Sequence, residues 1–119
     1  NSQKVLYMTW TQKTDQELQQ EMARAYFEMG KEIGADVAPV GLVWWDYLAA
    51  HPGEELFFED GRHAAKRGSL LAAYTIYQTI FRKPALPLAG EDEDICKASA
   101  DICALCADQV WNRKRSDSR

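Results

Sequence analysis

Hydrophobic and polar positions along the chain predict a strand followed by a helix. Residues 5–10, from Val5 to Trp10, form a nearly unbroken apolar and β-prone run, which is typical of a strand buried on both faces in a parallel sheet. Thr14 and Glu17 then match a capping box at a helix start, and Gly34 matches the residue that ends a helix. Between them, apolar residues recur at helical spacing on one face: Leu18, Met22, Ala25, Met29 and Ile33.

A second short strand is predicted from Asp36 to Val40, where Pro39 marks the strand end or an edge position. The order strand–helix–strand predicts a right-handed βαβ unit. A parallel sheet needs several strands and a cover on both of its faces. We therefore expect an α/β fold in which these elements belong to a larger parallel sheet with flanking helices.

The rest of the chain predicts further helical segments separated by turn residues. The aromatic stretch over residues 43–50 fits one or two helical turns and ends at His51-Pro52-Gly53. A long helix is expected from His63 or Ala64 to Phe81, and its apolar face consists of Leu70, Ala73, Tyr74, Tyr77, Ile80 and Phe81. The last helix, over residues 91–113, has an acidic first turn and a basic end, and both suit the helix dipole.

Length and composition narrow the class of protein. A chain of 119 residues fits one domain, and 46% hydrophobic with 27% charged residues is typical of a globular protein. The net charge of −4 gives no excess of basic residues of the kind that binds nucleic acid. No apolar run approaches the ~18 residues of a membrane helix. The chain begins at Asn1, directly before the strand-like run, so we expect residues 1–119 to be a processed chain or a fragment, the C-terminal part of a larger α/β domain.

Three cysteines lie in the last predicted helix, namely Cys96, Cys103 and Cys106. An odd number of cysteines in one helix is no disulfide framework, and Cys96 and Cys103 are roughly 10 Å apart along a helix, too far for a disulfide. A zinc site needs four ligands, and the nearby sequence offers at most three thiolates. We interpret the cysteines as small apolar core residues and expect neither a metal nor a cofactor.

The clearest candidate for chemistry is Asp60-Gly61-Arg62-His63, at the junction of a loop and a helix. An aspartate three residues before a histidine can hold the imidazole through Nδ1, which leaves the other ring nitrogen free to act as a general base. On spacing alone such a pair more often belongs to an ordinary solvated loop, and both interpretations stay open on this basis.

A longer series of segments strengthens the catalytic interpretation. It consists of the strand at residues 5–10, Val37-Ala38-Pro39-Val40-Gly41 before an aromatic turn, and Phe58-Glu59-Asp60-Gly61-Arg62-His63, followed by Gly68 and Leu70-Leu71-Ala72-Ala73-Tyr74. The series resembles the C-terminal half of the SGNH (GDSL-type) hydrolases, serine esterases on a flavodoxin-like three-layer α/β fold that are often exported by bacteria. The resemblance covers about two thirds of the chain and implies that Asp60 orients His63, the catalytic base.

The sequence also departs from that family. Ala64 stands where many members have Pro, and the chain carries neither the Gly-Asp-Ser block of the nucleophile nor the Gly and Asn of the oxyanion hole in a suitable context. We therefore expect the nucleophile to come from a missing N-terminal segment or from another chain. The alternative is a non-catalytic, self-associating structural or binding domain.

Three further residues are candidates for substrate binding. Trp44 and Trp45 could line a pocket beside His63, or could simply cover the sheet, and Arg62 could bind an anionic group or be a surface charge. The resemblance implies a carboxylic ester as substrate, such as an acylated carbohydrate, with no nucleic acid or membrane partner. The open edge of the strand from Val5 to Trp10 should recruit either a second copy of the chain or the missing N-terminal segment.

Overall fold

The two predicted strands pair in parallel, as the βαβ pattern requires. In a computed structural model that describes residues 2–112, β1 (Val5–Tyr7) pairs with β2 (Asp36–Ala38) so that Val5 lies opposite Asp36. Both strands are shorter than predicted. Met8 still donates its backbone N–H to the carbonyl of Ala38, 3.0 Å away, but the chain after β2 then turns into a helix and the pairing ends.

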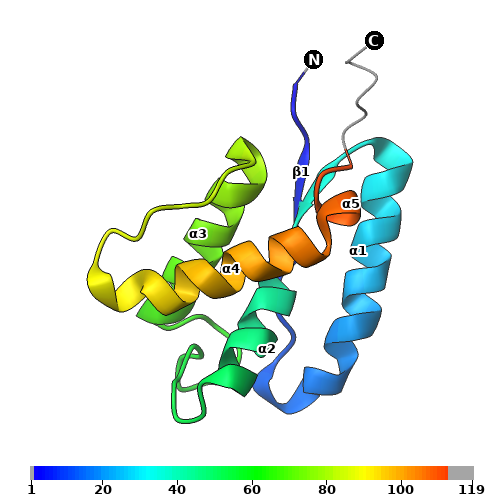
Figure 1. The fold of residues 1–119 in the computed structure, drawn as a ribbon. Helices are drawn as coiled ribbons and strands as arrows, with labels where there is room; N and C mark the ends of the chain where they lie inside the picture. The colour runs from blue at the N-terminus through cyan, green and yellow to red at the C-terminus, as the bar shows by residue number, and fades with distance from the viewer. Residues whose placement is uncertain (1, 113–119) are drawn as a thin grey trace.

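Helices surround this small sheet and make the protein a mixed α/β fold. Both α1 (Gln19–Ile33) and α3 (Lys66–Phe81) contact both strands, and they flank β1 on either side in Figure 1. In the same view α4 (Glu93–Leu105) crosses in front of α3. The remaining elements are α2 (Val40–Ala50), α5 (Ala107–Val110) and the 3₁₀ turns Lys13–Leu18 and Gly90–Asp92. No helix of residues 2–112 is long and apolar enough to span a membrane.

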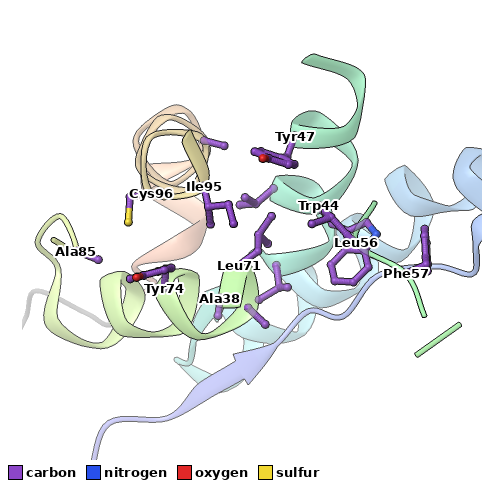
Figure 2. Packing of buried hydrophobic residues seen from close by; sticks show 14 residues of the cluster. Ala38, Trp44, Tyr47, Leu56, Phe57, Leu71, Tyr74, Ala85, Ile95 and Cys96 are labelled. Carbon is purple, nitrogen blue, oxygen red and sulfur yellow. The ribbon is translucent and has the colours of Figure 1, made fainter. Parts of the chain in front are cut away.

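The main core lies where α2, α3 and α4 meet. Trp44 on α2 is fully buried, and its ring stacks on Trp10 with 4.1 Å between centroids and meets Phe57 edge-on at 5.1 Å. Figure 2 shows Trp44 beside Leu56 and Phe57, with Leu71 next to them in the same cluster. The predicted one or two turns of helix at residues 43–50 are in fact a longer helix, because the apolar run begins at Val40.

The predicted start and core face of α1 are wrong. Residues Lys13–Leu18 form a 3₁₀ turn without a side-chain cap, so the predicted capping box is absent. The residues that α1 buries are Gln19, Ala23 and Gly30. The predicted apolar face is instead largely solvent-exposed, including Leu18, Met29 and Ile33. Gly34 ends the helix in the left-handed conformation at φ 69°, as predicted.

The predicted core face of α3 is also largely wrong. Tyr77, Ile80 and Phe81 are exposed, whereas the helix buries polar residues toward α4. Gln78 Nε2 donates to Ser99 Oγ at 2.7 Å, and Ser99 Oγ donates to Thr75 Oγ1 at 3.0 Å. These hydrogen bonds satisfy the buried polar groups, so helix packing here does not follow the apolar pattern.

The predicted single helix over residues 91–113 is in fact divided into two helices, because α4 ends at Leu105 and α5 starts at Ala107. The predicted end of that helix, at residue 113, lies outside the described residues. Cys96 and Cys103 are buried, which confirms that they are core residues, and Cys106 is partly exposed. Burial raises the pKa of the Cys103 thiol to about 11, so this sulfur is a weak nucleophile at neutral pH.

Gly68 on α3 gives a first test of the packing. Helix propensity alone assigns glycine a cost of about 1 kcal/mol relative to alanine. In the structure, a Cβ at Gly68 would meet the carbonyl oxygen of Leu56 and the ring of Trp44. We expect Gly68→Ala to lower the free energy of unfolding by about 1–3 kcal/mol in urea denaturation, and the exposed control Ser69→Ala to change it by less than about 0.5 kcal/mol. A stabilised Gly68→Ala protein would contradict this packing.

Candidate active site

Residues 57–64 form a tight hairpin that carries the Asp60–His63 pair. Phe57 and Ala64 form an isolated antiparallel bridge, and Phe58 donates its backbone N–H to the carbonyl of His63 at 2.7 Å. Gly61 makes the turn at φ 69°, a conformation that favours glycine. The hairpin ends directly before α3, where the sequence placed the junction between loop and helix.

The predicted hydrogen bond between Asp60 and His63 is confirmed. Asp60 Oδ2 lies 2.5 Å from His63 Nδ1. The other carboxylate oxygen, Oδ1, accepts the backbone N–H groups of Arg62 at 2.9 Å and His63 at 3.0 Å. Three hydrogen bonds therefore fix the carboxylate within the turn, and the carboxylate in turn fixes the orientation of the imidazole.

The electrostatics of the pair determine which ring nitrogen is free. The hydrogen bond from His63, followed by those from the backbone of Arg62 and His63, lowers the pKa of Asp60 well below its usual range. An ionised carboxylate can only accept hydrogen bonds, so Nδ1 of His63 carries the proton that is shared with Asp60. The side chain of His63 is 73% exposed, and its Nε2 has no hydrogen-bond partner among residues 2–112. Nε2 is thus available to a reacting group.

The segment after β1 holds the hairpin in place. Trp10 Nε1 donates to the carbonyl of Arg62 at 2.8 Å, and Lys13 donates its backbone N–H to the carbonyl of Gly61 at 2.9 Å. The Lys13 ammonium also forms a 2.9 Å salt bridge with Glu55 at the base of the hairpin. The pair therefore lies near the carboxyl end of β1, the end of a parallel sheet at which α/β proteins place their ligands.

Trp10 and Lys13 are the positioning residues that the sequence did not reveal. Their partners lie far away in the chain, 52 residues in the case of Trp10 and Arg62. Such a backbone contact leaves no spacing signal in the sequence, because any residue can supply the carbonyl. The only available hint is an indole N–H at the end of a strand, which usually needs a partner.

The structure corrects the interpretation of Trp44 as a pocket residue. Trp44 is fully buried between Trp10 and Phe57, so its ring offers no surface to a substrate. Trp45 is partly exposed and donates through Nε1 to Thr11 Oγ1 at 3.1 Å. It lines a hollow of about 670 Å³ between α1, α2 and α4 whose lining residues do not include His63.

Arg62 and a second hollow complete the surroundings of the pair. The backbone of Arg62 is bound on both sides, by Asp60 and by Trp10, while its side chain is exposed. On the other side of Trp10 lies an open hollow of about 530 Å³, lined by Trp10, Thr11, Gln12, Asp15, Leu18, Glu21 and Met22. Trp10 thus touches both the His63 hairpin and this hollow.

The lowered pKa of Asp60 predicts a loss of stability in acid. A carboxyl whose folded pKa lies below its unfolded value of about 3.9 stabilises the fold fully above that value, and this contribution is lost as the pH falls toward the folded pKa. We expect the melting temperature of the wild type to exceed that of Asp60→Asn at pH 7, and the difference to shrink between pH 4 and pH 2. A difference that stays constant over this range would contradict the assignment.

Within residues 2–112 there is no group of three or more His, Cys, Asp and Glu side chains that could hold a metal ion. Comparison with protein-family models, with curated proteins and with solved structures finds no match to this chain.

Proposed function

We propose that the chain is the C-terminal portion of an SGNH-like serine ester hydrolase and supplies the Asp-His part of its Ser-His-Asp triad. The observation that carries the proposal is the pair itself: Asp60 fixes His63 through Nδ1 and leaves Nε2 exposed at the carboxyl end of β1. A general base held by a carboxylate in this way is the arrangement that activates a serine hydroxyl. The two parallel strands and their flanking helices fit part of a flavodoxin-like sandwich.

The reaction would proceed in two steps of acyl transfer. First, a serine Oγ supplied by a segment outside residues 1–119 or by another chain attacks the ester carbonyl carbon, and Nε2 of His63 takes the serine proton. The bond to the alcohol then breaks, and His63 returns the proton to the leaving oxygen. Second, water attacks the acyl group, His63 takes a proton from that water, and the serine oxygen leaves with the proton.

The hollow beside Trp10 is the proposed site for the acyl group of the substrate. Its volume of about 530 Å³ falls in the usual range of small-ligand pockets, and Leu18 and Met22 give it apolar walls. Trp10 connects this hollow to the His63 hairpin, because its indole N–H donates a hydrogen bond to the carbonyl of Arg62, the residue before His63. The resemblance favours an ester of a carbohydrate, and the exposed side chain of Arg62 is available to an anionic group on it.

The presence of a serine nucleophile in the complete protein tests the proposal. We expect the coding sequence upstream of Asn1, or that of a chain co-purifying with it, to contain a Gly-Asp-Ser block, and the completed protein to hydrolyse short-chain nitrophenyl esters and acetylated sugars. The isolated chain should lack this activity. A natural protein that has no such block in either place, and no ester hydrolysis, would overturn the proposal.

A further inference from the structure

The outer edge of β1 has no neighbouring strand in the described part of the chain, where the sheet has the order β1-β2. In a parallel sheet, the backbone groups of alternate residues in a strand form hydrogen bonds toward opposite edges of that strand. Lys4 and Met8 bond to β2, because Lys4 accepts from Asp36 and Met8 donates to Ala38. The backbone groups of Val5 and Tyr7 therefore point to the open edge. An open edge of this kind recruits another strand.

An uncharged flank of α1 lies beside this edge, on one face of the sheet. It consists of Met22, Ala25, Met29 and Ile33 on α1 together with Leu18, the last residue of the 3₁₀ turn before it. Of these residues, Leu18, Met29 and Ile33 are more than 40% exposed. Leu18 and Met22 line the same hollow as Trp10, just after β1, which places this flank on the side of β1. Gln20 on the opposite flank of α1 and Glu17 in the preceding 3₁₀ turn border the hollow of α2 and α4 instead.

A second apolar flank borders the edge on the other face of the sheet. Ile80 and Phe81 on α3 are exposed, and the ring of Tyr77 packs on that of Phe81 with 4.7 Å between centroids. The carbonyl of Ile80 accepts a hydrogen bond from the side-chain amide of Gln3, two residues before the start of β1, and the same amide donates to Asp36 on β2. Apolar helix surface thus lies on both faces of the sheet, and a single added strand would leave it uncovered.

We propose that a second copy of this chain covers the edge, with β1 pairing antiparallel to β1 of the other copy around a two-fold axis. Such an axis keeps α1 against α1 on one face and α3 against α3 on the other. Both helices contact both strands, so each is centred near the gap between β1 and β2. The matching helices then lie about two strand spacings apart, roughly 10 Å, which is the distance of packed helices.

The uncharged flank of α1 is complementary to itself in this arrangement. Gln19, at the start of α1, bonds to Thr9 after β1, and α1 ends at Ile33 shortly before β2 begins beside Val5. The middle of α1 is therefore level with β1. Two antiparallel copies of α1 then place Leu18 opposite Ile33 and Met22 opposite Met29. The named residues that face each other are all apolar, and Glu21 lies at the border of the contact, which favours a second copy as the occupant.

The inference stands whether or not Asp60 and His63 are catalytic. A nucleophile-bearing segment that pairs with β1 would compete with the second copy for the same edge. The second copy would also cover Leu18 and Met22 of the hollow proposed for the acyl group, so the dimer is a state of the chain without that segment. The two ideas fail separately, because self-association is measured on the chain of residues 1–119 without any substrate, and hydrolysis on the completed protein.

Sedimentation velocity on the chain between 1 and 200 µM tests the proposal. We expect a species of twice the 13.5 kDa chain mass. Met29→Lys, at an exposed position, should raise the dimer dissociation constant at least tenfold, because it places an ammonium opposite Met22. Gln20→Lys adds the same charge on the opposite flank of α1 and should leave the dissociation constant within twofold. Circular dichroism verifies that both variants are folded.

Tyr7→Pro provides a second variant for the strand pairing. It removes a backbone N–H that points to the open edge and not to β2, so it should also raise the dissociation constant at least tenfold. A monomer at 200 µM would overturn the proposal. A dimer that neither Met29→Lys nor Tyr7→Pro weakens, or that Gln20→Lys weakens equally, would overturn it as well.

Discussion

Replacing Trp44 with alanine is expected to lower the free energy of unfolding by about 3–5 kcal/mol. Trp44 is fully buried, stacks on Trp10 and meets Phe57 edge-on, so its removal leaves a large cavity between α2 and the His63 hairpin. A loss of this size is a large part of the 5–15 kcal/mol that stabilises a typical domain. Chemical denaturation followed by circular dichroism measures it.

Two controls separate packing from other effects of this substitution. The Trp44 indole N–H has no hydrogen-bond partner in the described part of the chain, so Trp44→Phe loses no hydrogen bond and should cost less than Trp44→Ala. Phe58→Ala removes an exposed aromatic ring from the same hairpin and should change stability by less than about 0.5 kcal/mol. A Trp44→Ala protein as stable as Phe58→Ala would show that Trp44 is not a core residue.

The second large effect concerns catalysis by the completed hydrolase. Because positioned general bases contribute about 10²–10⁴-fold, we expect His63→Ala to lower kcat/KM for ester hydrolysis by that factor. Asp60→Asn should lower kcat strongly with little change in KM, because an amide can donate a hydrogen bond to the imidazole and favour the wrong tautomer. Steady-state kinetics on a nitrophenyl ester measures both variants.

His51→Ala is the matched control for these variants, because His51 is the other histidine of the chain. Its ring stacks on Tyr47 and lies 3.5 Å from Asp94, away from the hairpin. We expect kcat/KM within about threefold of the wild type, since no general base is lost. Equal losses in His51→Ala and His63→Ala would contradict the role of His63.

The local features of the sequence predicted part of this structure. Gly34 ends α1 because glycine adopts a positive φ without strain, and the β-prone runs around Val5 and Asp36 formed the parallel pair. The Asp60–His63 contact was also predictable, because both residues lie within one turn and the geometry of a turn is set by nearby residues.

Tertiary packing decided the features that the sequence did not predict. The apolar periodicity of α1 identified Leu18, Met29 and Ile33 as core residues, yet the helix buries Gln19, whose amide accepts from Thr11 and donates to Thr9. In the same way, Trp44 stayed a candidate for a pocket although a role in covering the sheet was favoured, because hydrophobicity does not distinguish the two. Contacts between distant segments carry no periodic signal, so they could not be predicted from the pattern.

The tautomer of His63 is the decisive test of the Asp60–His63 pair, and long-range ¹H–¹⁵N correlation spectra of the folded chain report it at a pH where the ring is neutral. We expect a protonated Nδ1, held by Asp60, and an unprotonated Nε2 that is free to accept a proton. Asp60→Asn should remove this preference, while His51 provides an internal reference. A neutral His63 protonated on Nε2, or an Asp60→Asn spectrum unchanged at His63, would contradict it.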